Sequence, residues 1–594
     1  MSQRSRRYEL IVVLFAAAVF LACIVSPPSL MDDVDSVQAQ IARNMLDSGD
    51  WVTARLDGVA YLEKAPAKYW SIAISFAIFG VHDWSARLPI ALFAVLLCWV
   101  TARMAAWAFS ELAGLYAGLA LATCIGLFLF TRILIPDATL TLFIALAMWA
   151  FLRALDEAEP HPRRWAAVLA ASIATGLLLK GLIAAVFPVG AALAYLAVTR
   201  RLFDRQTWRR LHVFSGILIV LAITAPWHIL ATIRNPPYFA WTMHSGPGEY
   251  HGFFWFYFIN EHLLRFLNLR YPNDYNTVPR ALFWLLHLVW LFPWAVFLPG
   301  AVKLGYRPVD RAGRTRLLAL CWIGFVLVFF TFSSTQEYYS MPCYPAFALL
   351  LGCAIAAGKS WVSVARRIVA GIAIAAAAAI VYILVNVWST PAPGDISRAL
   401  AQHPEVYTLS LGHLSDLTMQ SFAYLRTPLI VAGIAFVIGA AGLLLLRDLR
   451  AYLAMAVMMV VFFQAARLAL VVFDPYLSSR PLADALLKAP PGTLIEDHAY
   501  YTFSSVFFYT GRQDALLLNG RENNLEYGSY APNAPHVFID NSQFARLWAE
   551  PQRCYLLVEE PRVPLISAVV GQPALHVVAE RGGKYLFTNY AGPD

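Results

Sequence analysis

About thirteen apolar stretches of roughly twenty residues each recur along this chain, and they constrain its fold more than any other feature. A helix needs roughly 20 apolar residues to cross the hydrocarbon core of a bilayer. Backbone polar groups must be paired within the segment there, so each stretch is predicted to be a helix. The chain is therefore predicted to be an α-helical polytopic membrane protein. The predicted spans lie near residues 9–26, 85–104, 112–131, 134–153, 164–180, 181–199, 211–233, 279–301, 315–332, 340–358, 366–387, 427–446 and 450–473.

Composition agrees with this fold class. Hydrophobic residues make up 59% of the 594 positions and charged residues only 14%, which is too little charge to cover a soluble protein of this length. The net charge of +8 does not indicate a nucleic-acid partner, because the basic residues gather in particular loops. The chain also has no nucleotide-binding glycine loop. The apolar stretch 67–81 is short for a span and is predicted to lie in the membrane interface.

The basic loops predict the orientation. Lys and Arg are enriched on the cytoplasmic side of membrane proteins, and here every second loop is basic. With thirteen spans, this pattern predicts a cytoplasmic N-terminus and a C-terminus on the outer, periplasmic side. The six basic loops lie at the N-terminus and at 163–165, 200–210, 303–316, 366–367 and 447–450.

The last part of the chain differs from the rest. Short β-rich runs alternate there with turn residues and helix-like pieces. We therefore predict two domains, a transmembrane domain over 1–473 and a small periplasmic α/β domain over 474–594. The β-rich runs are 493–498, 515–519, 536–540, 554–560 and 575–587.

Polar residues in apolar surroundings lie almost entirely on the predicted outer side. Charges are expensive near hydrocarbon and usually have a function there. Because six separate loops contribute, we expect them to converge on one outward-facing cavity. The segments are the acid cluster at 32–35, then 61–70, 131–138, Lys180 with Gly181, 260–266 and 333–342.

Each segment also has a simpler interpretation. The acids at 32–35 could cap a helix, as could Asp137 at the start of its span. Glu63 and Lys64 could form a surface ion pair that contributes little. Lys180 could extend toward the lipid headgroups. His262 with Arg265 could bind headgroups nonspecifically, and Tyr338 with Tyr339 could belong to the aromatic belt of the interface.

Taken together, the set suits a transferase that uses a phosphorylated lipid. Lys and Arg can hold a phosphate leaving group. A carboxylate can take the proton of an incoming hydroxyl. No Ser-His-Asp order and no HExxH motif is present, which disfavours a hydrolase or a membrane protease.

The first outer loop also resembles a known family. Its segments QAQIARNMLDSGDW, YLEKAPAKYW and FGVHDWSARLP, within 38–89, are similar to the corresponding loop of the bacterial lipid-carrier-dependent glycosyltransferases. These membrane enzymes have the GT-C architecture and include protein O-mannosyltransferases and the aminoarabinose transferase that modifies lipid A. Further similar segments follow in order at 135–143, 177–188, 225–231, 258–267 and 332–352.

The resemblance implies an enzyme of the bacterial inner membrane, a glycosyltransferase for hexosyl or pentosyl groups. It implies transfer of a sugar from a polyprenyl-phosphate donor such as an undecaprenyl phosphate sugar to an acceptor hydroxyl on the periplasmic face. The acceptor would be lipid A, another envelope glycan or a protein, and the first outer loop, 27–84, would be catalytic. No cofactor is certain, although a divalent metal is possible.

The resemblance also assigns roles to residues. Asp33 or Asp35 would be the base or position the acceptor, with Asp137 as a further catalytic carboxylate. Five residues would bind the lipid phosphate or the donor, namely Lys64, Arg265, Lys180, Tyr339 and Tyr61. The remaining cavity residues would be Glu63, His262 and Tyr338, of which Glu63 and His262 are weak candidates for metal ligands.

The chain departs from the family pattern at three points. The usual adjacent acidic pair is Asp-Val-Asp here, so Val34 stands where an acid often does and the choice between Asp33 and Asp35 stays open. Ala65 replaces a proline in the EKPP motif, and 333–342 replaces a common Ser-Lys-Leu-x-x-Tyr segment. The change at 333–342 touches the cavity wall, so the identity of the sugar and of the acceptor stays open.

Two other classes of function compete with this interpretation. A polytopic transporter or lipid flippase would place charges near the bilayer midplane and often carry repeated halves, and neither feature is seen in this sequence. A noncatalytic anchoring protein would use the C-terminal domain to bind a partner.

Overall fold

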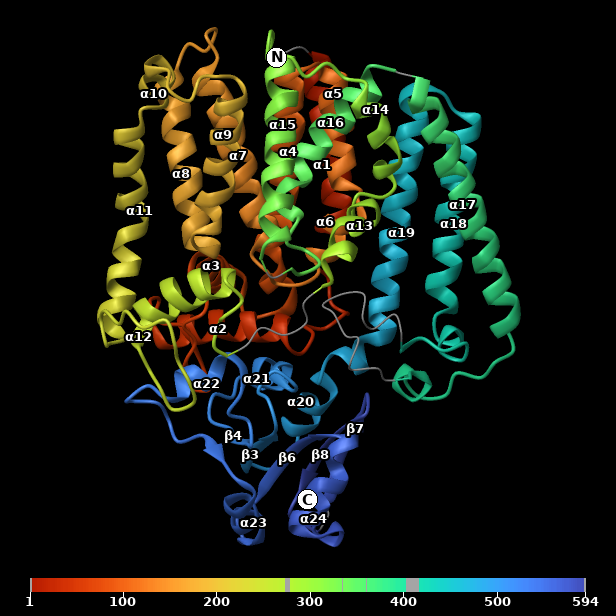
Figure 1. Cartoon of the computed structure of the whole chain (residues 1–594). Coiled ribbons are helices and arrows are strands. Elements are labelled where there is room, and N and C mark those ends of the chain that lie inside the picture. The colour runs from red at the N-terminus through yellow and green to blue at the C-terminus, as the bar shows by residue number, and fades with distance from the viewer. Residues whose placement is uncertain (1–2, 273–277, 334, 359, 402–415, 592–594) are drawn as a thin grey trace.

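The computed structural model describes residues 3–591 except 273–277, 334, 359 and 402–415, so Ser334 of the predicted segment 333–342 lies outside the described residues. Long helices stand side by side in one bundle, with the N-terminus at one end and the C-terminal sheet beyond the other (Figure 1). Two helices lie between the bundle and the C-terminal region (Figure 1).

Each predicted span has a helical counterpart among the described residues. Two spans are interrupted, because Thr123 and Cys124 separate two helices and the segment around Pro293 bends the chain by 94°. The counterparts are α1 (Gln3–Phe20), α4 (Asp83–Ala108), α5 (Glu111–Ala122) with α6 (Ile125–Phe130), α7 (Asp137–Leu155), α8 (Pro162–Lys180), α9 (Ile183–Val198), α10 (Arg205–Leu211) with α11 (Val213–Arg234), α13 (Arg280–Trp290) with η2 (Trp294–Phe297) and α14 (Leu298–Val302), α15 (Arg311–Thr331), η3 (Met341–Cys343) with α16 (Tyr344–Ala356), α17 (Ser360–Val387), α18 (Arg426–Leu445) and α19 (Asp448–Leu477).

The described helices identify a multi-pass membrane protein. Seven of them are long and apolar enough to cross a bilayer, or eight if the pair bent by 94° counts as one span. Four further apolar helices are shorter, so thirteen membrane crossings stay a prediction. The predicted first span at 9–26 is shifted toward the N-terminus, since α1 covers Gln3–Phe20.

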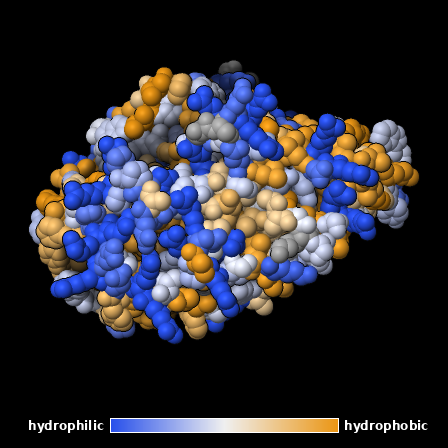
Figure 2. All heavy atoms as spheres, turned by 90° about the horizontal axis from the view of Figure 1, so that it is seen from above, coloured by the Kyte–Doolittle hydropathy of each residue, from blue (hydrophilic) through white to orange (hydrophobic). Residues whose placement is uncertain are grey.

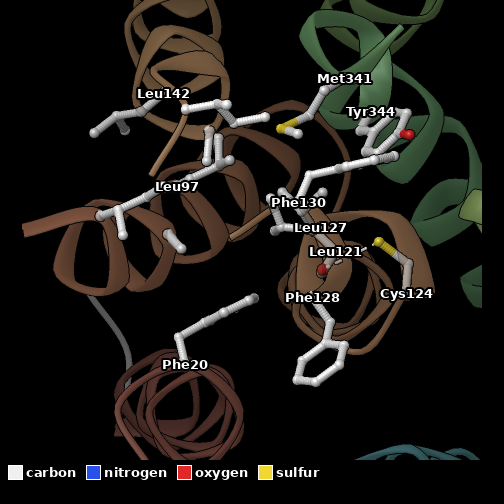
Figure 3. Packing of buried hydrophobic residues seen from close by; sticks show 14 of the residues in the cluster. Phe20, Leu97, Leu121, Cys124, Leu127, Phe128, Phe130, Leu142, Met341 and Tyr344 are labelled. Carbon is white, nitrogen blue, oxygen red and sulfur yellow. Dashed lines mark hydrogen bonds between the residues drawn. The ribbon is translucent and has the colours of Figure 1, made fainter. Parts of the chain in front are cut away.

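Burial differs strongly between these helices. In α7, 83% of the most apolar stretch of 18 residues is buried inside the protein. The corresponding stretch of the span that contains α11 is only 11% buried. Helix α7 is thus central, while α11 presents its apolar surface to the surroundings. Figure 3 shows the core beside α7, where the labelled side chains from α1, α4, α5, α6, α7 and α16 converge.

Hydrophilic residues gather at the end of the bundle remote from the C-terminal region, over the loops that carry the basic clusters (Figure 2). Their position opposite the C-terminal region agrees with the predicted topology. The side of the membrane on which each end lies stays a prediction.

Helices α2 (Val34–Ser48) and α3 (Ala67–Phe79) lie at the other end of the bundle, next to the C-terminal region (Figure 1). Helix α3 corresponds to the short apolar stretch predicted at 67–81. Between α2 and α3, β1 (Arg55–Leu56) pairs antiparallel with β2 (Val59–Ala60). Both turn residues have positive φ, 48° at Asp57 and 76° at Gly58, as tight hairpin turns require.

The segment 252–264 is another part of this end. Helix α12 (Gly252–Phe254) continues into the π-helical segment η1 (Trp255–Leu264). Wide helical turns of this kind are rare and are frequent at functional sites.

The C-terminal region contains a six-stranded sheet of order β5-β4-β3-β6-β8-β7. The first four strands in this order are parallel and the last two pairings are antiparallel. The predicted small α/β fold is therefore confirmed, while the division of the chain at 473/474 stays a prediction. The strands are β3 (Thr493–Asp497), β4 (Leu516–Leu518), β5 (Phe538–Ile539), β6 (Cys554–Glu559), β7 (His576–Arg581) and β8 (Lys584–Thr588), and the helices are α20 (Arg480–Leu486), α21 (Ser504–Thr510), α22 (Asn523–Ser529), α23 (Asn541–Ala549) and α24 (Val563–Val570).

Candidate active site

Two cavities meet at the end of the bundle that faces the C-terminal region. The first has a volume of about 340 Å³ and mostly apolar walls, and we call it the apolar cavity. The second has a volume of about 350 Å³ and walls in which charged and polar side chains are mixed with apolar ones, and we call it the polar cavity. All eleven residues proposed from the sequence line one or both of them. The six residues common to both are Glu63, Lys64, Asp137, Lys180, Arg265 and Tyr339.

The walls of the two cavities differ in chemistry. Aromatic and aliphatic side chains of α9, η1 and α15 line the apolar cavity, among them Phe187, Phe258 and Phe330. The acid cluster, Lys68, Arg270 and residues of the C-terminal region line the polar cavity. A molecule that is apolar at one end and polar at the other can thus occupy both cavities, with its junction at the six common residues.

The three acids after the first helix have three different environments. Asp32 is bound to the C-terminal region, with its Oδ1 accepting from the Ser505 N–H at 2.8 Å and its Oδ2 lying 2.7 Å from the Lys584 Nζ. Asp35 is fully buried, and its Oδ1 accepts from the Leu134 N–H at 2.8 Å. These two carboxylates hold separate parts of the chain together.

Asp33 lies between them and lines the polar cavity. Among the residues that the structure describes, no donor or cation pairs with its carboxylate, and its side chain does not cap α2. Its φ of 67° lies in the left-handed region, which is strained for a residue with a Cβ. Burial raises the pKa of Asp33 to about 7, with smaller contributions from Asp32 and Asp35. The helix-cap interpretation is therefore wrong for this residue, which has the properties of a general base.

Asp137 and Lys180 form a buried ion pair between α7 and α8. The Lys180 Nζ donates to Asp137 Oδ1 at 2.6 Å, while Asp137 Oδ2 is buried without a hydrogen-bond partner among the described residues. Lys180 also lies over the rings of Tyr338 and Tyr339, at 5.1 and 4.9 Å from the ring centroids. Lys180 therefore does not extend into the headgroups, and Asp137 does not cap its helix with its side chain.

Glu63 lies at the centre of a cluster of cations. Its Oε1 pairs with Lys64 and lies 3.7 Å from Arg265 Nη1, and its Oε2 accepts from the Tyr61 hydroxyl at 2.7 Å. Arg265 also contacts Glu261 at 2.9 Å. Burial acts to raise the pKa of Glu63, but the nearby cations hold it well below its usual range. The Glu63–Lys64 pair is thus part of a buried network rather than an isolated surface pair.

His262 is held in place by both ring nitrogens. Its Nδ1 contacts the Tyr257 carbonyl, and its Nε2 accepts from the Leu182 N–H at 3.0 Å. Burial lowers the pKa of His262 to about 4, so the ring is neutral. A Cβ on Gly181, whose φ is 80°, would come within 2.1 Å of the His262 Nε2, so this approach requires glycine.

The weak metal candidates are not arranged as metal ligands. Both nitrogens of His262 are already used, and both oxygens of Glu63 face donors or cations. Among the described residues, no group of three or more His, Cys, Asp or Glu side chains is placed to hold a metal ion.

Sequence reasoning missed four residues of this network. Lys68 donates to Gln38 and lines the polar cavity, and it lies one helical turn beyond Lys64, a spacing that could have indicated it. Arg270 and Glu261 pair with each other close to Arg265 in the sequence. Asn524 contacts Glu63 from the C-terminal region, which no local pattern could have indicated.

Basic side chains gather where the two cavities meet. Lys64, Lys180 and Arg265 line both cavities, and Lys68 and Arg270 line the polar cavity. Glu63, Asp137 and Glu261 pair with four of these side chains, while burial lowers the pKa of Lys68 to about 7. Lys and Arg side chains gathered in this way can bind a phosphate group.

Comparisons with known proteins agree with the resemblance noted in the sequence. The dolichyl-phosphate-mannose-protein mannosyltransferase family model matches residues 63–230. An undecaprenyl phosphate-alpha-4-amino-4-deoxy-L-arabinose arabinosyl transferase of Aeromonas salmonicida is 32% identical over 327 residues, which cover 53% of this chain and 54% of the relative. A second such transferase, from Pseudomonas fluorescens, is 29% identical over 59% of this chain and 56% of the relative. The chain thus spans about half the length of these curated relatives.

The likeness to a solved structure extends over nearly the whole chain. The crystal structure of ArnT from Cupriavidus metallidurans bound to undecaprenyl phosphate matches with a TM-score of 0.77 at 23% identity, over 98% of this chain and 99% of that one. The GT-C fold predicted from the sequence is therefore confirmed, including the small α/β region at the C-terminus.

Proposed function

We propose that this chain, which has the fold of a lipid-carrier-dependent glycosyltransferase, transfers a sugar from a polyprenyl-phosphate donor to an acceptor hydroxyl. One observation carries the proposal: an apolar and a polar cavity meet at three basic side chains, Lys64, Lys180 and Arg265, while Lys68 and Arg270 line the polar cavity. A polyprenyl-phosphate sugar has the matching polarity, with an apolar tail, an anionic phosphate and a polar sugar. Among the relatives, the named carrier is undecaprenyl phosphate, which we propose as the donor lipid here.

The apolar cavity suits the first isoprene units of the donor. Its aromatic walls include Phe187, Phe258 and Phe330, and they lead directly to Lys64 and Arg265. These two side chains are 23% and 22% exposed, so they can reach a phosphate that enters the cavity. When the bond between the sugar and the phosphate breaks, negative charge grows on the phosphate, and cations already in place stabilise that charge.

The polar cavity suits the acceptor and the sugar. Asp33 would take the proton of the acceptor hydroxyl as the hydroxyl oxygen bonds to the anomeric carbon. The electron pair of the broken carbon–oxygen bond stays on the phosphate beside Lys64 and Arg265. With a pKa of about 7, Asp33 is partly ionised at neutral pH and its conjugate acid is weak enough to make it an effective base.

We propose that Asp137 binds the sugar. Lys180 occupies its Oδ1, and its Oδ2 is a buried acceptor without a partner among the described residues. A hydroxyl or amino group of the sugar would satisfy this oxygen.

The acceptor is proposed as lipid A, another envelope glycan or a protein, on the periplasmic face of the bacterial inner membrane. The orientation rests on the basic loops, which lie at the end of the bundle remote from the two cavities and the C-terminal region. The N-terminus would then be cytoplasmic and the C-terminal region periplasmic.

The test uses purified protein in detergent with an undecaprenyl-phosphate sugar and cell-envelope lipid acceptors. We expect consumption of the donor and release of undecaprenyl phosphate, and loss of both in Asp33→Asn and Lys64→Ala proteins that still fold. A transporter or flippase would not consume the donor, because transport needs two compartments. Intact donor with every acceptor, or full activity in both variants, would contradict the proposal.

A further inference from the structure

Helix α22 of the C-terminal region is inserted between two loops of the candidate site. It packs directly on β2, because a Cβ on Gly528 would lie 2.0 Å from the Ala60 carbonyl oxygen. Strand β2 leads into the loop that carries Glu63 and Lys64. This side of α22 is therefore fitted to the backbone of the first outer loop, with no room for a side chain.

The other side of α22 contacts the segment that leads to Arg265. The ring of Tyr527 stacks on Phe256 with centroids 4.1 Å apart. Its hydroxyl accepts from the His251 N–H at 2.9 Å and donates to the Gly252 carbonyl at 3.0 Å. Helix α22 thus joins two loops that are almost two hundred residues apart in the sequence and that supply the phosphate-binding cations.

Asn524, near the start of α22, connects the charged groups of these loops. Its Nδ2 donates to Glu63 Oε2 at 2.5 Å, and its Oδ1 accepts from Arg270 Nη2. The orientation of this amide is fixed by chemistry, because a carboxylate only accepts and a guanidinium only donates. An amide is the simplest side chain that can bind an anion and a cation at the same time.

This bridge affects how much positive charge faces a phosphate. Glu63 pairs with Lys64 and lies near Arg265 through Oε1, while Tyr61 and Asn524 hold Oε2 on the opposite side. Without Asn524, Glu63 Oε2 keeps the Tyr61 hydroxyl and Arg270 keeps Glu261 and the Pro272 carbonyl, but the link between the two side chains is lost and the Glu63 carboxylate is held less firmly. A carboxylate that turns toward the two cations neutralises them and weakens their hold on a phosphate.

We propose that α22 clamps the two phosphate-binding loops together and that Asn524 is a positioning residue for the phosphate site. The inference rests on the proposed function, since it concerns how the lipid phosphate is bound. It makes the C-terminal region part of the binding site rather than an accessory module.

Binding of sugar-free undecaprenyl phosphate to the purified full-length protein in detergent tests the clamp. We expect Asn524→Ala to weaken this binding about tenfold, as the loss of one hydrogen bond to a charged group implies. Gln552→Ala is the matched control, because it removes an exposed amide of the same C-terminal region whose one side-chain hydrogen bond, among the described residues, goes to Thr493 Oγ1. It should bind like the wild type.

Asn524→Asp separates positioning from a loss of folding. It places a second carboxylate within hydrogen-bond distance of Glu63, and two such groups do not ionise together readily. Relative to the wild type at each pH, we expect weak binding at pH 8 and recovery toward pH 5.5, where a protonated Asp donates to Glu63. A packing defect alone would show no such recovery. The charged groups that face this position are Glu63, Lys64, Glu261, Arg265 and Arg270.

The outcomes are distinguishable. If the wild type does not bind undecaprenyl phosphate, the proposed function is overturned and this inference with it. If the wild type binds and Asn524→Ala binds equally well, or if Asn524→Asp shows the same ratio to the wild type at pH 8 and pH 5.5, the positioning role is wrong and the proposed function stands.

Discussion

Replacing Asp33 with Asn should abolish sugar transfer and stabilise the protein at the same time. Burial raises the pKa of Asp33 from 3.8 to about 7. Below pH 4 the carboxyl is protonated in both the folded and the unfolded chain. Between pH 4 and 7 the unfolded chain loses this proton while the folded chain keeps it, so stability falls as pH rises and stays lower above pH 7.

The size of the effect follows from this shift. A change of about three pKa units corresponds to about 4 kcal/mol. Asp33 is partly exposed to the polar cavity, and water there screens roughly half of this free energy. The destabilisation that remains is about 2 kcal/mol. An Asn is nearly the same size, carries no charge and also tolerates positive φ, so it should recover this amount at neutral pH.

Two assays check the prediction, sugar transfer from pH 5.5 to 8.5 and the midpoint of thermal unfolding. Wild-type transfer should rise with pH through an apparent pKa near 7, and the variant should lose about 10²- to 10⁴-fold, the usual contribution of a general base. Asp35→Ala is the control and should lower the unfolding midpoint, because Asp35 accepts from the Leu134 N–H, which would stay buried without a partner. An active Asp33→Asn protein, or one less stable than the wild type at pH 8, would refute the reasoning.

Three further predictions concern the cation cluster and the clamp. Lys64→Ala should abolish measurable sugar transfer and weaken binding of undecaprenyl phosphate at least tenfold without changing the unfolding midpoint much; wild-type binding would remove Lys64 from the phosphate site. Lys180→Met should destabilise the fold by about 3–5 kcal/mol, because it leaves the Asp137 carboxylate buried without its cation. Adding Asp137→Asn should recover part of that loss in thermal unfolding, and a double variant no more stable than Lys180→Met would contradict the pairing. Gly528→Ala should impair both transfer and binding of undecaprenyl phosphate, since the new Cβ would meet the Ala60 oxygen at 2.0 Å; wild-type binding in this variant would argue against the clamp.

Much of the architecture was predictable because hydrocarbon imposes a simple rule on sequence. Apolar length located the helices, and alternating basic loops placed the six polar segments at one end of the bundle. Backbone breaks were not predictable in this way. The stretch 112–131 is uniformly apolar, yet it divides after Ala122, and the stretch 279–301 bends by 94°. Apolar content does not report where a helix ends inside the bundle.

The candidate residues were predictable as a group, while their individual states were not. The sequence left Asp33 and Asp35 equivalent, and only the positions of the Leu134 N–H and Arg87 show that Asp35 is engaged. The part played by Asn524 depends on the docking of a region more than 450 residues beyond Glu63. Contacts of this kind are set by tertiary structure and leave no local pattern.

The arrangement of the acids explains how a strained, uncompensated carboxylate is kept in place. Asp32 is bound to Ser505 and Lys584 of the C-terminal region, and Asp35 to the loop before α7. A residue fixed on both sides can be held at an unfavourable φ, because its neighbours lose their own bonds if it relaxes. The Asp33 side chain is thereby directed to the polar cavity without any donor of its own. Adding a donor would lower its pKa and weaken it as a base, so the two neighbouring acids position Asp33 without pairing with it.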